Sequence, residues 1–141
     1  MEVQVNYLAV FLAAASSMAV GAIWYAQSVF GKQWAKLAKV DMSKEVKPGQ
    51  MGLLLGSTFI ASLVTAYVLA HVTYLSSQFF NKDLMESALT TAFWLWLGFT
   101  AARLYVHDTF EGRRKKLTGL NSLHELVTFM VMAAVIGAIG L

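Results

Sequence analysis

The stretch MGLLLGSTFIASLVTAYVLAHVTYLSSQF, from Met51 to Phe79, decides the fold class because it contains no Asp, Glu, Lys or Arg residue. A transmembrane helix needs about 20 apolar residues to cross ~30 Å of hydrocarbon, and this stretch is long enough to tilt or to extend past the bilayer. Three other stretches are also apolar nearly all round: Val5–Val29, Leu84–His107 and Leu120–Leu141. Because a soluble helix bundle would carry polar stripes on its helices, we expect all four stretches to span a membrane.

The sequence therefore predicts an all-α membrane protein, with residues 1–141 forming a single integral membrane domain. We expect an antiparallel bundle of four transmembrane helices, at about 5–29, 51–79, 84–107 and 120–141. The composition agrees with this class, since 57% of the residues are hydrophobic and 13% are charged. The chain has no cysteine, which excludes disulfides, thiolate metal sites and thiol catalysis.

The basic residues predict the orientation of the helices. Nearly all of them lie in or beside the loops at 30–50 and 108–119: Lys32, Lys36, Lys39, Lys44, Lys47, Arg103, Arg113, Arg114, Lys115 and Lys116. The positive-inside rule places both loops in the cytoplasm and both chain termini outside it. Topology and contact with anionic membrane lipids account for this basic excess, so we expect lipids as partners and no nucleic acid.

The segment from Gly21 to Val40 predicts a short amphipathic helix directly after the first transmembrane helix. Trp24 and Tyr25 lie where that helix leaves the hydrocarbon, the depth that amphipathic rings prefer. Beyond them Phe30 and Trp34 recur at helical spacing, with lysines on the other side of the segment. The predicted interfacial anchor comprises Trp24, Tyr25, Phe30, Trp34, Lys32, Lys36 and Lys39. Anchoring alone and recognition of lipid or a partner are both open readings of this segment.

Two stretches carry a resemblance to a known family. Residues 21–34 form the pattern GAxWYxxxxFGxxW, and residues 97–121 read LGFTAARLYVHDTFEGRRKKLTGLN. Both resemble the domain of unknown function 1761 family of small bacterial membrane proteins, although Gln27 and Arg114 stand where proline is common in that family. The resemblance implies a multi-pass four-helix protein of the prokaryotic cytoplasmic membrane, with no assigned activity.

Small residues predict where helices pack closely. Three pairs have small-xxx-small spacing: Ser17 with Gly21, Gly52 with Gly56, and Ala133 with Gly137. Such faces let transmembrane helices approach one another. They can assemble the helices of one chain or join copies in a homo-oligomer, and the sequence leaves both open.

Few ionisable residues fall within the apolar stretches, and these are the candidates for a site. Arg103 and His107 share a helix face, and Asn121 and Glu125 lie on the following helix at a similar depth. The four predict a polar pocket that binds an anion or a polar head group, with a snorkelling interfacial arginine as the alternative. The weak metal candidates are His107, Glu111 and His124. Because no HExxH-type motif joins them, we expect no metal site and no cofactor.

The sequence contains no recognisable catalytic constellation, so no enzyme activity and no catalytic residue are expected. Two function classes stay open. The first is a non-catalytic, homo-oligomeric module that binds lipid or a partner at the inner membrane surface. The alternative is an oligomeric channel or transporter-like conduit for a small solute or ion, lined by hydroxyl-bearing residues such as Ser62 and Thr65.

Overall fold

The computed structural model describes residues 3–141, which form helices and no strand. The elements follow one another in this order: α1 (Tyr7–Trp24), α2 (Gly31–Ala38), α3 (Pro48–Phe80), α4 (Leu84–Leu95), the π-helix η1 (Trp96–Ala101), α5 (Ala102–Phe110) and α6 (Lys115–Ile139). The prediction of an all-α chain is confirmed.

Short polar residues and proline set the ends of these helices. The Asn6 side chain caps α1 by accepting hydrogen bonds from two backbone N–H groups, at 3.0 and 3.3 Å. The Asp83 carboxylate caps α4 in the same way, and Pro48 occupies the first position of α3, where no N–H is needed. Lys39 and Asn81 end α2 and α3 in left-handed conformations, with φ of 56° and 51°.

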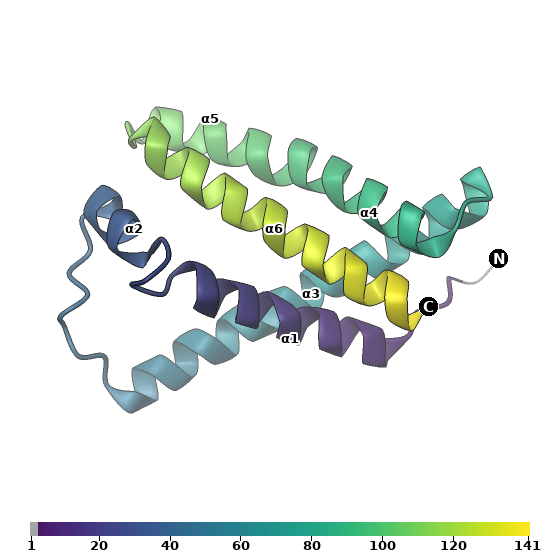
Figure 1. The fold of residues 1–141 in the computed structure, drawn as a ribbon, viewed down its shortest axis with the longest axis horizontal. Helices are drawn as coiled ribbons and strands as arrows, with labels where there is room; N and C mark the ends of the chain where they lie inside the picture. The colour runs from purple at the N-terminus through teal and green to yellow at the C-terminus, as the bar shows by residue number, and fades with distance from the viewer. Residues whose placement is uncertain (1–2) are drawn as a thin grey trace.

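The four long helical segments lie side by side and alternate in direction (Figure 1). Helix α6 packs against α1 and α4, and α3 packs against the same two helices. The start of α1 and the end of α6 lie at one end of the molecule, together with the α3–α4 turn. The opposite end holds α2 and the α5–α6 turn, and we refer to it as the α2 end.

Alanine dominates the helix contacts. Within the core, Leu69, Met132 and Ile136 are the large side chains that are fully buried. The remaining fully buried positions are mostly alanines: Ala9, Ala13, Ala14, Ala66, Ala70, Ala88, Ala92 and Ala133. Because so many contacting side chains are small, helix backbones approach closely, which is how helices associate in an apolar solvent.

Three helices within residues 3–141 are long and apolar enough to cross a membrane: α1, α3 and α6. The fourth predicted stretch, 84–107, is helical from Leu84 to Phe110, but η1 interrupts it. The pieces contain 12, 6 and 9 residues. At the start of η1 the indole N–H of Trp96 donates to the Ser122 carbonyl of α6, at 2.8 Å. Three of the four predicted membrane spans are therefore supported by the lengths and composition of the helices.

Two helix boundaries differ from the expected ones. Helix α1 ends at Trp24 rather than near Val29, because residues 25–30 form a tight turn. Helix α6 begins at Lys115 rather than near Leu120. The chain reverses there over only four residues, 111–114, with Gly112 at φ 66°. The loop expected at 108–119 is thus mostly helix, and its basic residues sit at the start of α6.

The first half of α3 stands apart from the other helices (Figure 1). Residues 48–58 are all exposed, and the Leu53 side chain keeps 75% of its surface accessible. A Cβ added at Gly52 or Gly56 would meet nothing within 4 Å. Among the described residues, this small-residue pair therefore packs against no other helix.

The other two small-residue pairs lie in helix contacts. A Cβ on Gly137 would come within 2.8 Å of Met85 Sδ, so α6 approaches α4 closely there, and Ala133 is fully buried. Ser17 is buried, and a Cβ on Gly21 would lie 3.8 Å from His124 Nε2. These pairs serve packing within the chain.

Candidate functional site

A tight turn joins α1 to α2 at the α2 end of the molecule. The backbone N–H of Phe30 donates to the Trp24 carbonyl at 3.1 Å, and that of Gly31 donates to the Ala26 carbonyl at 2.9 Å. A Cβ on Gly31 would lie 2.2 Å from the Tyr25 carbonyl oxygen and 2.8 Å from that of Ala26. Only glycine fits this position, and α2 starts directly from it.

Five rings gather around this turn, and we call them the aromatic cluster: Trp24, Tyr25, Phe30, Trp34 and His124. Ring centroids lie 4.5 Å apart for Trp24 and Phe30, and 5.3 Å apart for Tyr25 and Trp34. The imidazole of His124 on α6 lies 4.9 Å from the Tyr25 ring and 5.8 Å from the Trp24 ring. Such distances are those of interacting aromatic pairs. The cluster therefore connects the end of α1, α2 and α6.

Polar groups of α6 border the aromatic cluster. The Tyr25 hydroxyl donates to Asn121 Oδ1 at 3.5 Å, and His124 Nδ1 lies 3.4 Å from Glu125 Oε1. Burial, followed by the nearby Glu125 carboxylate, raises the pKa of Tyr25 above its usual value of 10.0. The indole Nε1 of Trp24 is buried and has no hydrogen-bond partner among residues 3–141.

The structure divides the polar pocket expected from the sequence. Asn121 and Glu125 meet Tyr25 and His124, whereas Arg103 and His107 are exposed on α5. Within residues 3–141 no hydrogen bond or ion pair joins Arg103 to Asn121 or Glu125. Trp96, near the middle of this helical run, does reach α6, because its indole N–H donates to the Ser122 carbonyl.

The α5–α6 turn is held by the largely buried carboxylate of Asp108. Its Oδ2 accepts a hydrogen bond from the Thr118 hydroxyl at 2.6 Å, and its Oδ1 lies 3.8 Å from Arg113 Nε. Arg113 Nε also donates to Glu111 Oε2 at 2.6 Å. Both acidic groups near the turn are thus engaged, and the turn has a defined shape.

Two hollows lie where α2 faces this turn. One of about 620 Å³ is lined by Lys36 of α2 together with Arg114, Lys115 and Lys116. The other, of about 340 Å³, shares Leu37 and Arg114 with the first and adds Lys39, Arg113 and Glu111. We call their cationic lining the basic surface: Lys36, Lys39, Arg113, Arg114, Lys115 and Lys116.

The charges of the basic surface are largely unneutralised. Apart from Arg113, none of its six residues forms an ion pair with an acidic side chain among residues 3–141. Lys115 and Lys116 also begin α6, where the helix dipole adds positive potential. The arrangement can attract and hold anionic groups such as phosphates. Lys32 is exposed on α2 but lines neither hollow.

The weak metal candidates do not form a site. His124 lies in the aromatic cluster, whereas Glu111 pairs with Arg113 in the turn and His107 is exposed on α5. Among the described residues no group of three or more His, Cys, Asp or Glu side chains could hold a metal ion.

Sequence reasoning missed two features of this end of the molecule. It placed His124 among weak metal ligands and did not predict that its imidazole packs next to α1. The signal was Gly21, whose missing side chain leaves space on α1 for that ring. It also treated the two basic loops as separate interfacial segments. No local pattern predicts that the α2 lysines and the Arg113–Lys116 run share one surface.

A model of the family described as "Protein of unknown function (DUF1761)" matches residues 8–137 of the chain. No curated protein and no solved structure matches it. The match spans all the helices that build the aromatic cluster and the basic surface.

Proposed function

The chain belongs to the DUF1761 family, and we propose that it is a non-catalytic membrane module that binds anionic lipid head groups through its basic surface. The observation that carries the proposal is that cationic side chains from α2 and from the start of α6 line the same two adjoining hollows. These segments lie far apart in the sequence and meet through the fold.

In this proposal Leu84–Phe110 is the fourth transmembrane segment of an antiparallel bundle. A continuous helical run of this length measures about 40 Å at 1.5 Å per residue, which exceeds the ~30 Å hydrocarbon core. A π turn inside the run preserves its backbone hydrogen bonding, so it does not prevent spanning. The direct contacts of α4 with α3 and α6 support the same arrangement.

The proposed orientation places the α2 end at the cytoplasmic surface of a prokaryotic inner membrane, with both termini outside the cytoplasm. The positive-inside rule supports it, since α2, the loop after it, the α5–α6 turn and the start of α6 carry nine of the eleven Lys and Arg residues. Trp24, Tyr25 and Trp34 then lie at the membrane interface. The amphipathic helix α2 lies along the inner leaflet, held there by the aromatic cluster.

Charge complementarity supports anionic lipid as the ligand. The cytoplasmic leaflet carries anionic head groups, and each Lys or Arg near it gains about 1 kcal/mol. The two hollows offer several such side chains around a concave surface, which lets one phosphate contact more than one of them. A flat distribution of the same charges would attract lipid without retaining any particular head group.

We also propose that copies of the chain associate through the first half of α3. Gly52 and Gly56 contact no other helix among residues 3–141, and their small-xxx-small spacing is typical of faces where transmembrane helices pair. The surrounding leucines are exposed. A homo-oligomer would cover this face.

Native mass spectrometry of the protein released from nanodiscs of equal phosphatidylglycerol and phosphatidylcholine tests the lipid proposal. We expect phosphatidylglycerol adducts to dominate on the native chain. The double variant Lys36→Ala with Lys115→Ala should lose this preference, and either lysine removed alone should weaken it by about fivefold. The control, Lys44→Ala with Lys47→Ala, removes the same charge on the same side but outside the hollows.

Two results would contradict the proposal: an unchanged lipid preference in the basic-surface variant, or an equal loss in the control. The same spectra report the number of chains in the released particle. The conduit alternative predicts solute flux through proteoliposomes that is lost when Ser62 and Thr65 become apolar. Thr65 donates to the Ala61 carbonyl of its own helix at 3.1 Å, and no observation favours a lumen there.

A further inference from the structure

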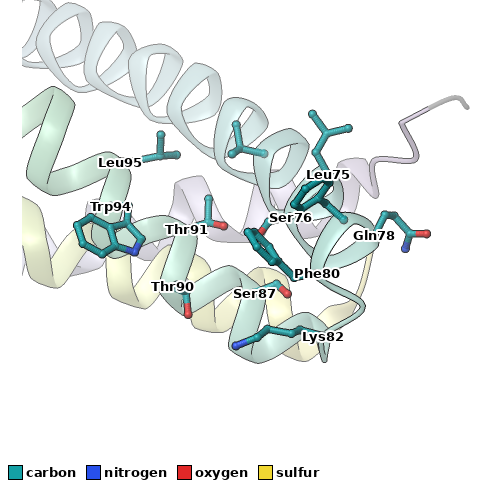
Figure 2. A pocket seen from close by; sticks show the side chains of 12 residues that line it. Leu75, Ser76, Gln78, Phe80, Lys82, Ser87, Thr90, Thr91, Trp94 and Leu95 are labelled. Carbon is teal, nitrogen blue, oxygen red and sulfur yellow. The ribbon is translucent and has the colours of Figure 1, made fainter.

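A third hollow, of a different character, lies at the opposite end of the molecule. It is a groove of about 1080 Å³ between the last turns of α3 and helix α4, which lines it from Ser87 to Leu95. Figure 2 shows side chains of both helices around this space. Its volume is at the upper end of the range that small-molecule sites occupy.

The sides of the groove are apolar and aromatic. Leu75, Phe79 and Phe80 contribute from α3, and Trp94 and Leu95 contribute from α4 (Figure 2). Phe79 keeps 82% of its surface accessible and Trp94 keeps 62%. Leu95 packs against the core, whereas Phe79 and Trp94 form no part of it and can contact an apolar molecule in the groove.

Hydroxyl groups from both helices interrupt this apolar lining: Ser76, Ser87, Thr90 and Thr91. Ser87 has only 1% of its surface accessible, and its Oγ has no hydrogen-bond partner among residues 3–141. By contrast, the Ser77 hydroxyl on α3 donates to the Tyr74 carbonyl of its own helix at 2.8 Å. A buried hydroxyl without a partner is costly, and a ligand with a polar head would supply one.

The charges at the groove are already neutralised. Lys82 is the charged side chain that lines it, and its ammonium group forms an ion pair with Glu86 one turn into α4. The nearby Asp83 carboxylate accepts the capping hydrogen bonds of α4. Among the described residues that line the groove, no unpaired cation is left for a phosphate, so the lining fits an uncharged head group.

We propose that this groove binds an uncharged membrane amphiphile whose hydroxyl or carbonyl head hydrogen bonds to Ser87 and Thr91. Its hydrocarbon chain lies along Leu75, Phe79 and Trp94. The site is separate from the basic surface in both place and chemistry. A charged phospholipid is disfavoured because its head group would lack a cationic partner there.

Photo-crosslinking in nanodiscs tests this proposal. The probes are diacylglycerol and phosphatidylglycerol, each with a diazirine in an acyl chain, and peptide mapping locates the labelled residues. The binding variant is Ser87→Ala with Thr91→Val, which removes two hydroxyls with little change in volume. The matched control is Ser57→Ala with Thr58→Val, because these hydroxyls lie on exposed α3 and bond to the Leu54 carbonyl.

We expect diacylglycerol to label residues 72–80 and 87–95 in preference to phosphatidylglycerol at equal mole fraction. The binding variant should lower this labelling about 3- to 10-fold for each hydroxyl bond lost, and the control should not. If the binding variant fails to fold, Thr90→Phe provides a second test. Thr90 is exposed and lines the groove, so a ring at this position should fill the groove without disturbing the core. That variant should abolish labelling.

Three results would overturn the proposal. Equal labelling by both probes would indicate ordinary lipid contact. Labelling that all variants leave unchanged would show that the hydroxyls recognise nothing. No labelling of the groove by either probe would show that lipid does not occupy it.

Discussion

Replacing Gly31 by alanine should disconnect α2 from the rest of the molecule. The new Cβ would lie 2.2 Å from the Tyr25 carbonyl oxygen, 2.8 Å from that of Ala26 and 2.9 Å from the Ala26 carbonyl carbon. All three are backbone atoms, so no side chain can move aside. The turn at residues 25–30 must open, and α2 must shift with it.

The cost can be estimated from the contacts that this shift disturbs. Overpacking of a tight site costs about 1–3 kcal/mol, and loss of the Tyr25–Trp34 ring contact costs about 0.5–1.5 kcal/mol. We therefore expect Gly31→Ala to lower the free energy of unfolding by about 2–4 kcal/mol. Unfolding by SDS titration in mixed micelles measures this change.

The same variant should weaken lipid binding, because α2 carries Lys36 and Lys39. Phosphatidylglycerol retention measured by native mass spectrometry should fall towards that of the Lys36→Ala, Lys115→Ala variant. Gly119→Ala is the matched control, since a Cβ there meets nothing within 4 Å. If Gly31→Ala unfolds like the native chain and keeps its lipid preference, the turn does not position the basic surface and the reasoning fails.

Three further predictions concern single contacts. Gly137→Ala places a Cβ within 2.9 Å of the Met85 backbone, so it should push α6 away from α4. The free energy of unfolding in SDS should fall by about 1–3 kcal/mol, and native-like stability would show that the helices do not approach so closely. Asp108→Asn weakens the hydrogen bond from the Thr118 hydroxyl and the attraction of Arg113. The free energy of unfolding should fall by about 1–2 kcal/mol, and amide hydrogen exchange in the α5–α6 turn should become faster. Unchanged exchange would count against a structural role of Asp108. Because the pKa of Tyr25 is raised in the folded chain, its contribution to stability is full below pH 10 and is lost as the pH rises further. SDS unfolding between pH 9 and 12 should therefore show that Tyr25→Phe loses less stability at alkaline pH than the native chain does. Equal losses of stability in both chains would refute this.

The sequence predicted the helical stretches because their signal is local. Apolar residues in an uninterrupted run such as Met51–Phe79 identify a spanning helix without any knowledge of its neighbours. The boundaries were less accurate where tertiary contacts set them. Helix α1 ends early because Gly31 permits the tight turn, and α6 starts early because Gly112 reverses the chain.

The site was less predictable because it depends on which helices meet. The sequence placed Asn121 and Glu125 in a polar pocket, but their partners are Tyr25 and His124 rather than Arg103 and His107. The π-helix η1 changes which face of the 84–110 run each later residue occupies, because a π turn rotates the residues after it relative to a regular α-helix. Arg103 comes just after η1, so its i, i+4 spacing from His107 could not predict whether it would face α6.

The central claim is that α2 and the start of α6 act as one binding surface, and a double-mutant cycle tests it most directly. The cycle compares phosphatidylglycerol affinity, from native mass spectrometry, for the native chain, Lys36→Ala, Lys115→Ala and the double variant. If both lysines hold the same head group, their effects are non-additive, with a coupling of at least about 0.5 kcal/mol. Strictly additive effects would show that the two lysines attract lipid independently, and the proposed common surface would then be wrong.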